Sequence, residues 1–284
     1  MQLVSYNIQY GYGRDGRYDL RRPVEAVRSA DIVAMQEVER GWRRSNMDDQ
    51  PELIWSMLAD RYWIYGPQLD VDASTRGGDG RIVNRRRQHG QMILSRWPIL
   101  SSRLLILPKL ETSPTFNFVT GALEAVVATP SGPMRIYAVH LGYVSAAERM
   151  AQAAQLRDLV QRAPAEGGVW SGEDSDPAHW QSDEPAPPMP ASAVVLGDFN
   201  AERKSEEMRL LTGRPEGLAD AWVHLLGRSA DGVTFRADPA RGVPADCHID
   251  HALVTPDLLP RLRRIWIDRT TEASDHQPVW LEMD

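Results

Sequence analysis

Short apolar runs alternate with segments of helical pattern along almost the whole chain. Nine runs are rich in Val, Ile and Leu and have the length of β-strands. They are residues 2–8, 31–38, 92–99, 121–129, 134–141, 193–200, 249–255, 262–269 and 278–283. Because strand-like and helix-like segments alternate, the pattern predicts an α/β fold.

The helix-like segments are residues 18–30, 50–60 and 145–163. Asp19 is placed to cap the first helix, and Pro51 lies in the first turn of the second, where no N–H is needed. In the third, Ser145 and Glu148 have the spacing of a capping box, and the interior is rich in Ala, Leu and Gln. We therefore expect residues 145–163 to form a long, well-defined helix.

Two long stretches break this alternation. Residues 70–89 are polar and Arg-rich, and residues 163–192 are rich in Pro, acidic residues and Trp. Loops of this length are uncommon unless they are functional or disordered. The strand-like runs on both sides of each stretch look like parts of one core. We therefore expect a single domain over residues 1–284, with loop insertions at about 70–89 and 163–192.

Charge and composition narrow the class of protein. The formal net charge of −7 over 284 residues argues against a surface built mainly to neutralise nucleic-acid phosphates. The single cysteine, Cys247, excludes a disulfide within the chain and a cysteine metal cluster. No apolar run has the length of a membrane span, and the opening residues lack the features of a signal peptide. These features lead us to expect a cytoplasmic protein.

Polar residues recur where the predicted strands begin or end: Asn7, Glu37, His140, Asp198, Asn200, Asp250, Asp275 and His276. Each residue alone has an ordinary structural explanation as a turn residue, a helix cap or a solvated loop residue. Together they form a chemically coherent set. Glu37, Asp275 and Asn7 offer the carboxylate and amide oxygens that Mg²⁺ or Mn²⁺ prefers.

The remaining members of this set suit the hydrolysis of a phosphate ester. Asp250 can hold His276 in one tautomer and keep it protonated near phosphate. Asp198 can orient or deprotonate a water molecule, and Asn200 can donate a hydrogen bond to a transition-state oxygen. The GxSxG pattern of a serine nucleophile is absent from the sequence. The set therefore points to metal-assisted attack by water on a phosphorus ester.

The same residues carry a family resemblance. The segments SYNIQY, MQEV, GQMILSRWPI, AVHLGY, VLGDFN, HIDHALV and SDHQPV occur in the order found in the endonuclease/exonuclease/phosphatase superfamily. The chain resembles that superfamily from Asn7 to His276. The resemblance implies the DNase I-like fold, a two-sheet β-sandwich flanked by helices in four layers (α/β/β/α), with the site at one edge of the sandwich.

The resemblance also implies roles for individual residues. Glu37 matches an acidic metal ligand with Asn7 beside it, and Asp275 matches an acid that touches the metal region. Asp198 and Asn200 match a pair that handles the attacking water and the phosphate. Asp250 matches the acid that pairs with the terminal His of the family, and His276 matches that His. His140 matches a His that contacts phosphate or assists the leaving group.

Two positions depart from the pattern of abasic-site endonucleases in this superfamily. Gln9 stands where those relatives often carry an acid, and His140 stands where they usually carry Tyr. Gln9 predicts a first metal shell that differs from theirs, and His140 favours branches other than abasic-site repair. Arg149 and Gln152, three apart on one helix face, are predicted either to point back toward the site or to form a surface salt bridge and a core-rim amide.

Substrate choice has to come from the loops. An arginine cluster that includes Arg85, Arg86 and Arg87 can bind an anionic headgroup or a nucleic-acid backbone, or it can be a solvated loop. Trp170 and Trp180 can stack on a base, cover an apolar tail, or only anchor their loop. The first hypothesis is a Mg²⁺- or Mn²⁺-dependent phosphodiesterase acting on a small or lipid-derived substrate. A nuclease is the alternative, and a non-catalytic binding module is less favoured.

Overall fold

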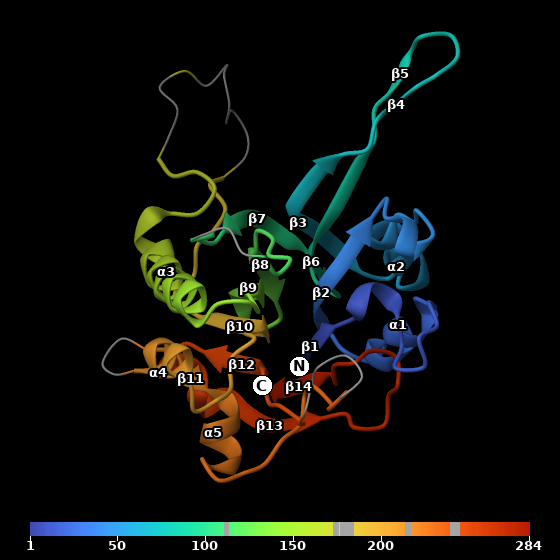
Figure 1. The fold of residues 1–284 in the computed structure, drawn as a ribbon. Coiled ribbons are helices and arrows are strands. Elements are labelled where there is room, and N and C mark those ends of the chain that lie inside the picture. Colours follow the sequence, from blue (N-terminus) through green and yellow to red (C-terminus); the bar gives the residue numbers. More distant parts are fainter. Residues whose placement is uncertain (111–113, 173–175, 177–184, 214–216, 239–244) are drawn as a thin grey trace.

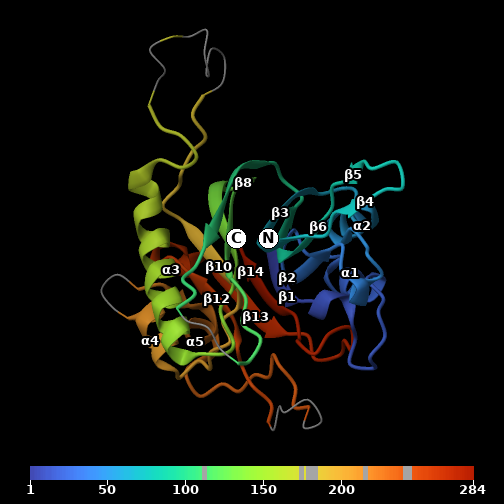
Figure 2. The same cartoon turned by 45° about the horizontal axis from the view of Figure 1, so that its top comes forward.

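The computed structural model describes residues 1–110, 114–172, 176, 185–213, 217–238 and 245–284. Two six-stranded mixed sheets pack face to face, and helices cover the outer face of each sheet (Figure 1). Figure 2 shows the four layers from another side, with α1 and α2 outside one sheet and α3 and α4 outside the other. The predicted DNase I-like sandwich is therefore confirmed.

The first sheet joins the beginning and the end of the chain. Its strands are, in spatial order, β13 (Leu262–Ile267), β14 (Val279–Met283), β1 (Gln2–Asn7), β2 (Ile32–Arg40), β6 (Arg86–Ser95) and β3 (Tyr62–Asp72). Strand β1 runs parallel to β2, whereas the other neighbours are antiparallel. The C-terminal strand thus closes the sheet beside the N-terminal one.

The second sheet comes from the middle of the chain. Its strands are, in spatial order, β11 (Ala219–Asp220), β12 (Asp250–Val254), β10 (Ala193–Asp198), β9 (Gly132–His140), β8 (Gly121–Thr129) and β7 (Ile99–Ile106). Strands β9 and β10 are parallel. Two short strands, β4 (Thr75–Arg76) and β5 (Ile82–Val83), pair separately.

The helices lie outside the sandwich. They are α1 (Arg21–Val27), α2 (Gln50–Met57), α3 (Ala146–Glu166), α4 (Glu206–Thr212) and α5 (Ala221–Leu226), with 3₁₀ turns η1 (Gln9–Gly11), η2 (Arg43–Ser45) and η4 (Pro256–Arg261). None of the helices in the described residues is long and apolar enough to cross a membrane.

Strands that are apolar on both faces explain this layering. Leu3 and Ile32 point into the core between the sheets, whereas Val4 and Val33 point outward against the helices. Successive side chains on a strand face opposite ways, so a strand covered on both sides needs apolar residues at every position. The uninterrupted apolar runs in the sequence are the result.

Some predicted boundaries were wrong. The run at 92–99 spans the end of β6, a turn at Trp97 and Pro98, and the start of β7. The first helix begins only at Arg21, after Leu20 at the cap position, which makes no side-chain cap bond. Asp19 nevertheless accepts a hydrogen bond from the Arg21 backbone N–H at 3.0 Å, so it still satisfies a donor of the first turn.

The stretch at 70–89 is not a loop insertion but a β-ribbon. Strands β3 and β6 remain paired as far as Asp72 and Arg86, and β4 and β5 continue the hairpin away from the body (Figure 1). Arg86 Nε lies 2.7 Å from Asp70 Oδ1 across the ribbon. The alternation of Asp and Arg on opposite strands is therefore the cross-strand pairing of an exposed hairpin.

The stretch at 163–192 begins inside α3, which runs through Pro164 to Glu166 and is capped by Gly167 at φ 81°. Trp170 lies in this stretch and has 36% of its surface exposed. The prediction for Trp180 concerns a residue that lies outside the described part of the chain.

Candidate active site

Three neighbouring strands place His140, Asp198 and Asp250 side by side. Asp198 pairs in register with His140 on β9 and with Asp250 on β12. The three side chains are 1–3% exposed. Gly197 is required here, because a Cβ atom at that position would lie 2.0 Å from the Val139 carbonyl oxygen. The second sheet therefore supplies three residues of the site, which stand opposite one another on neighbouring strands.

The first sheet supplies Asn7 and Glu37. Asn7 Nδ2 donates to Glu37 Oε1 at 3.2 Å and to Asp198 Oδ2 at 3.1 Å, so this amide joins the two sheets. Glu37 sits at an irregularity between β2 and β6 with φ 60°, and Asn200 has φ 48°. Such left-handed backbone costs about 1–3 kcal/mol per residue and collects at functional sites.

Asp250 and His276 form a buried pair, as predicted. His276 Nδ1 lies 2.8 Å from Asp250 Oδ2, and His276 Nε2 lies 3.6 Å from Asp198 Oδ2. The ring of Phe235 packs against His276 with 4.6 Å between centroids. The imidazole is thereby fixed between two carboxylates, with its orientation set by Asp250.

These contacts give the two histidines different charge states. Burial lowers the pKa of His276, but the Asp250 and Asp198 carboxylates outweigh burial and raise that pKa to about 10. Burial lowers the pKa of His140 to about 4, partly opposed by the charge of Glu37. Burial raises the pKa of Asp198 to about 7, although the His276 cation acts in the other direction. At neutral pH the site therefore holds a cationic His276 and a neutral His140.

Asn200 and Asp275 lie at the border of this cluster. The backbone N–H of Asn200 donates to Asp198 Oδ1 at 2.8 Å, and its side-chain amide donates to the Leu141 carbonyl at 2.9 Å. The hydroxyl of Ser274 lies 2.7 Å from the Asn7 carbonyl oxygen and 3.3 Å from Asp275 Oδ1. The segment around Asp275 is thus tied to the end of β1.

Arg149 and Gln152 have structural partners instead of open space beside the site. Gln152 is buried, accepts from the Gly142 N–H at 2.7 Å and donates to the Thr120 hydroxyl at 3.1 Å. Arg149 Nε lies 3.1 Å from Glu207 Oε1. Since Gly142 follows His140 closely, Gln152 holds the segment that carries His140. The structure thus agrees with the structural alternative for both residues.

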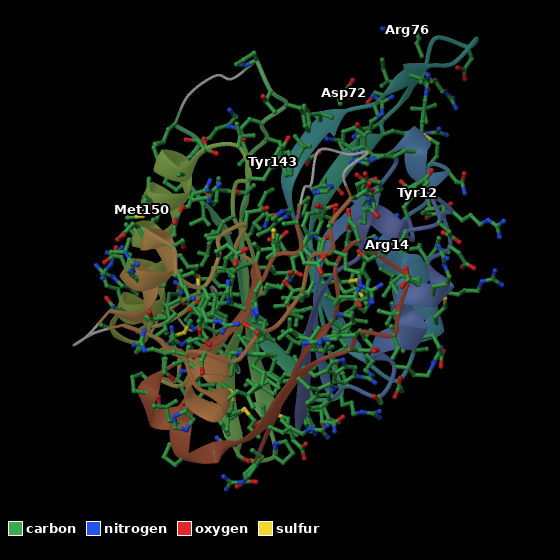
Figure 3. All side chains as sticks on the ribbon, turned by 60° about the horizontal axis from the view of Figure 1, so that its bottom comes forward. Tyr12, Arg14, Asp72, Arg76, Tyr143 and Met150 are labelled. Carbon is green, nitrogen blue, oxygen red and sulfur yellow. The ribbon has the colours of Figure 1, made fainter. Side chains whose placement is uncertain are left out.

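The arginines at 85–87 are not brought to the polar cluster. All three lie on the ribbon, which projects from the body, and Arg86 is paired with Asp70 (Figure 1). Asp72 and Arg76 mark this ribbon at the upper edge of Figure 3. Their role in substrate binding stays a prediction that requires a substrate long enough to reach the ribbon.

Sequence reasoning did not identify His89, whose ring lies 6.5 Å from that of His140. His89 Nδ1 lies 3.1 Å from Glu39 Oε1, and both side chains are buried. The available signal was position, because His89 directly precedes the GQMILS motif and Glu39 is two residues beyond Glu37. Phe118, which also belongs to this region, carried no motif, and Tyr143 ends the AVHLGY segment but was not singled out.

The donor set fits a hard divalent cation. Carboxylate and amide oxygens predominate, and Asp250 Oδ1 is buried without a hydrogen-bond partner among the described residues. Donor atoms of Asp198, Asp250 and His276 lie within 4.8 Å of one another. A protonated imidazole has no lone pair to offer, however, so the cationic His276 is not a suitable ligand. A divalent cation is therefore better accommodated on the side of the cluster where Glu37 and Asn7 lie.

Comparisons with known proteins agree with this fold. A model of the Endonuclease/Exonuclease/phosphatase family matches residues 4–276. No curated protein matches the chain. Solved structures with the same fold include an endonuclease/exonuclease/phosphatase from Beutenbergia cavernae (TM-score 0.68, 19% identity, 99% of this chain and 70% of that chain).

Two further structures show the range of activities on this fold. One is a mannosyl-6-phosphatase from Bacteroides thetaiotaomicron (TM-score 0.65, 14% identity, 100% of this chain and 99% of that chain). The other is a 3'-5' exonuclease from Neisseria meningitidis (TM-score 0.59, 17% identity, 100% of both chains). These low identities support the fold alone, whereas the family model covers nearly all of the chain. The chain therefore belongs to the endonuclease/exonuclease/phosphatase family, whose members include hydrolytic phosphoesterases and nucleases.

Proposed function

We propose that the protein is a divalent-metal-dependent phosphodiesterase that hydrolyses a small or lipid-derived phosphate ester. The observation that carries the proposal is the position of Asp198 Oδ2. This buried oxygen lies 3.1 Å from Asn7 Nδ2 and 3.6 Å from a nitrogen of each of His140 and His276. Buried acids facing one another destabilise a fold, so a non-catalytic scaffold has no physical reason to keep them.

Glu37, Asn7 and Asp275 are the proposed holders of Mg²⁺ or Mn²⁺. The bound ion would supply neutralisation of charge on the phosphate oxygens. The protein's own residues orient the reaction. Asp198 accepts a hydrogen bond from the attacking water, and Asn200 donates to a phosphate oxygen.

The two histidines have different proposed tasks. His276 is cationic and stabilises the charge that grows on the phosphorus oxygens in the transition state. His140 is neutral and contacts the phosphate or the leaving group. As the water oxygen bonds to phosphorus, that water gives a proton to Asp198 and the P–O ester bond breaks, and the departing alkoxide takes up a proton from bulk water.

The second candidate is a nuclease. It is favoured by one feature, the ribbon with Arg85, Arg86 and Arg87, because consecutive arginines can bind the phosphates of a nucleic-acid backbone. The net charge of −7 favours the smaller substrate, and His140 argues only against an abasic-site endonuclease.

A panel of phosphomonoesters, phosphodiesters, phospholipids and plasmid DNA separates the candidates. The purified protein is assayed with EDTA, then with Mg²⁺ or Mn²⁺ restored. Turnover of a small diester without plasmid nicking supports the proposal, and nicking at a higher rate supports the nuclease. Failure to hydrolyse any member with either metal would leave only the binding module.

A further inference from the structure

His89, like His276, has a carboxylate beside its Nδ1, but among the described residues it faces one carboxylate, whereas His276 lies between two. His89 Nδ1 lies 3.1 Å from Glu39 Oε1, and Glu39 is fully buried. Glu39 also accepts from the Arg44 guanidinium and from the Ser45 hydroxyl, so its position is fixed on several sides. In the neutral tautomer whose Nδ1 donates to Glu39, the lone pair of the ring is on Nε2.

The second ring nitrogen of His89, Nε2, does not contribute a hydrogen bond to the described part of the fold. His89 Nε2 is buried and has no hydrogen-bond partner among the described residues. A buried acceptor without a partner destabilises a protein by about 1–3 kcal/mol. Such an atom beside a catalytic cluster is expected to find its partner in a ligand.

Phe118 packs beside the rings of both His89 and His140, and two further aromatic rings contact Phe118. Phe118 packs nearly perpendicular to His89, with 5.1 Å between centroids, and lies 6.2 Å from His140. Phe116 and Tyr143 contact Phe118 and are 67% and 42% exposed. Figure 3 shows Tyr143 on the α3 side of this face, with Tyr12 and Arg14 on the α1 side. Exposed aromatic rings are costly in water unless they serve binding.

Helix α3 fixes the aromatic segment in place. Glu148 is fully buried, and its carboxylate accepts from the Leu110 N–H at 3.0 Å and from the Asn117 amide at 3.3 Å. Gln152, one turn further, binds Thr120 and Gly142. The helix therefore holds both the aromatic segment and the segment after His140, which keeps their relative position constant.

We propose that His89, Phe118, Phe116 and Tyr143 form a substrate subsite for a planar ring that carries an N–H or O–H donor, such as a nucleobase. The ring stacks on the aromatic side chains, and its donor binds His89 Nε2. Phe118 is half-buried beside exposed neighbours. This inference rests on the proposed phosphodiesterase activity, since it describes the organic group esterified to the phosphate.

A planar heteroaromatic ring fits these observations better than an alkyl chain. An alkyl chain would cover His89 Nε2 and leave that nitrogen without a partner, at the cost given above. A ring with a donor on its edge satisfies the nitrogen and also stacks on the exposed rings. Among small or lipid-derived substrates, the subsite therefore selects esters of a nucleoside-like group.

The test compares three methyl phosphodiesters that differ only at the ring. They are the methyl esters of thymidine monophosphate, of its analogue N-methylated on the ring nitrogen, and of its base-free analogue. Wild-type kcat/KM should fall about tenfold from the first to the third, the scale of one stacking interaction. His89→Asn, which can keep the bond to Glu39 but lacks the distal nitrogen, should abolish the difference between the first two. His89→Gln, which reaches further, should restore part of it.

Phe118→Ala should abolish the advantage of both ring-bearing esters over the base-free one. Tyr62 on β3 is an aromatic residue with 52% exposure that is not part of the proposed subsite. Tyr62→Ala is therefore the matched control and should leave kcat/KM for the three esters unchanged. Equal losses for all three esters in His89→Asn would overturn the proposal, as would no change in either variant. Calorimetric binding of thymidine monophosphate and of deoxyribose phosphate repeats the comparison without turnover. A ring preference in binding with no hydrolysis of any ester would refute the proposed activity but support the subsite.

Discussion

Separate and joint substitution of Asp250 and His276 tests the central electrostatic feature of the site. The pair is 2.8 Å apart and both residues are at least 95% buried. His276→Ala should lower kcat by roughly a hundredfold or more, the scale found when one transition-state donor is removed. Asp250→Asn should be similarly severe, because it removes the charge that keeps the ring protonated and oriented. The double variant should be little worse than His276→Ala alone, since the residues act as one unit.

The same pair gives a stability signature that does not depend on turnover. The pKa of His276 rises from an ordinary value of about 6.5 to about 10 in the fold, because the Asp250 and Asp198 charges outweigh burial. A raised pKa adds stability that is fully present below pH 6.5 and is lost as the pH rises through about 10. Each pH unit in this window should remove at most about 1.4 kcal/mol from the free energy of unfolding.

Urea unfolding in EDTA at a series of pH values measures this slope. The wild type should lose stability between about pH 6.5 and 10, and His276→Asn should lack that component of the slope. Parallel curves for the two proteins would show that His276 is not held as a cation. In the kinetic cycle, losses that multiply fully in the double variant would show that Asp250 and His276 work separately.

Three further predictions test the metal, the insertion and the support from α3. Glu37→Gln should weaken Mn²⁺ binding in a metal titration and slow turnover by orders of magnitude while circular dichroism stays unchanged; wild-type rates at limiting metal would remove Glu37 from the ligand set. Shortening the stretch at 163–192 beyond the end of α3 should leave the fold intact and change KM or substrate preference, and a loss of folded protein would assign it a structural role. Gln152→Ala should lower the free energy of unfolding by about 1–3 kcal/mol, because the Gly142 N–H loses its partner. Gln155→Ala on the same helix is the control, and an equal effect there would contradict the assignment.

The strands were the most predictable part of the fold, for a physical reason. Each of the runs is apolar at nearly every position, as a strand requires when both of its faces are covered. The ends were less predictable, and the run at 92–99 joined two strands across Pro98. The ribbon at 70–89 was missed because its stability depends on pairing between the strands, such as Arg86 with Asp70, and exposed strands lack the apolar pattern.

The candidate site was predictable where its residues stand at strand ends. Asn7, His140 and Asp198 each close an apolar run, and the topology then brings the ends of these runs together. Glu148 shows the limit of local patterns. The capping box predicted a bond back to Ser145, and the Ser145 hydroxyl does accept from the Glu148 N–H at 3.3 Å. The Glu148 carboxylate instead binds a segment more than thirty residues earlier, which no local spacing encodes.

This division between strand ends and connecting segments separates chemistry from selectivity. The residues proposed to act on the phosphate mostly stand at the ends of strands buried in the sandwich, and the Asn7–Asp198 bond requires both sheets to be in place. Their geometry is therefore as fixed as the core itself. Phe116, Phe118 and Tyr143 lie on connections, where the core imposes no identity on a side chain. Changes in these connections can therefore alter which ester enters while the residues around the phosphate stay in position. His89 lies on β6 and its ring packs against Phe118, so it is where the fixed part of the site meets the variable one.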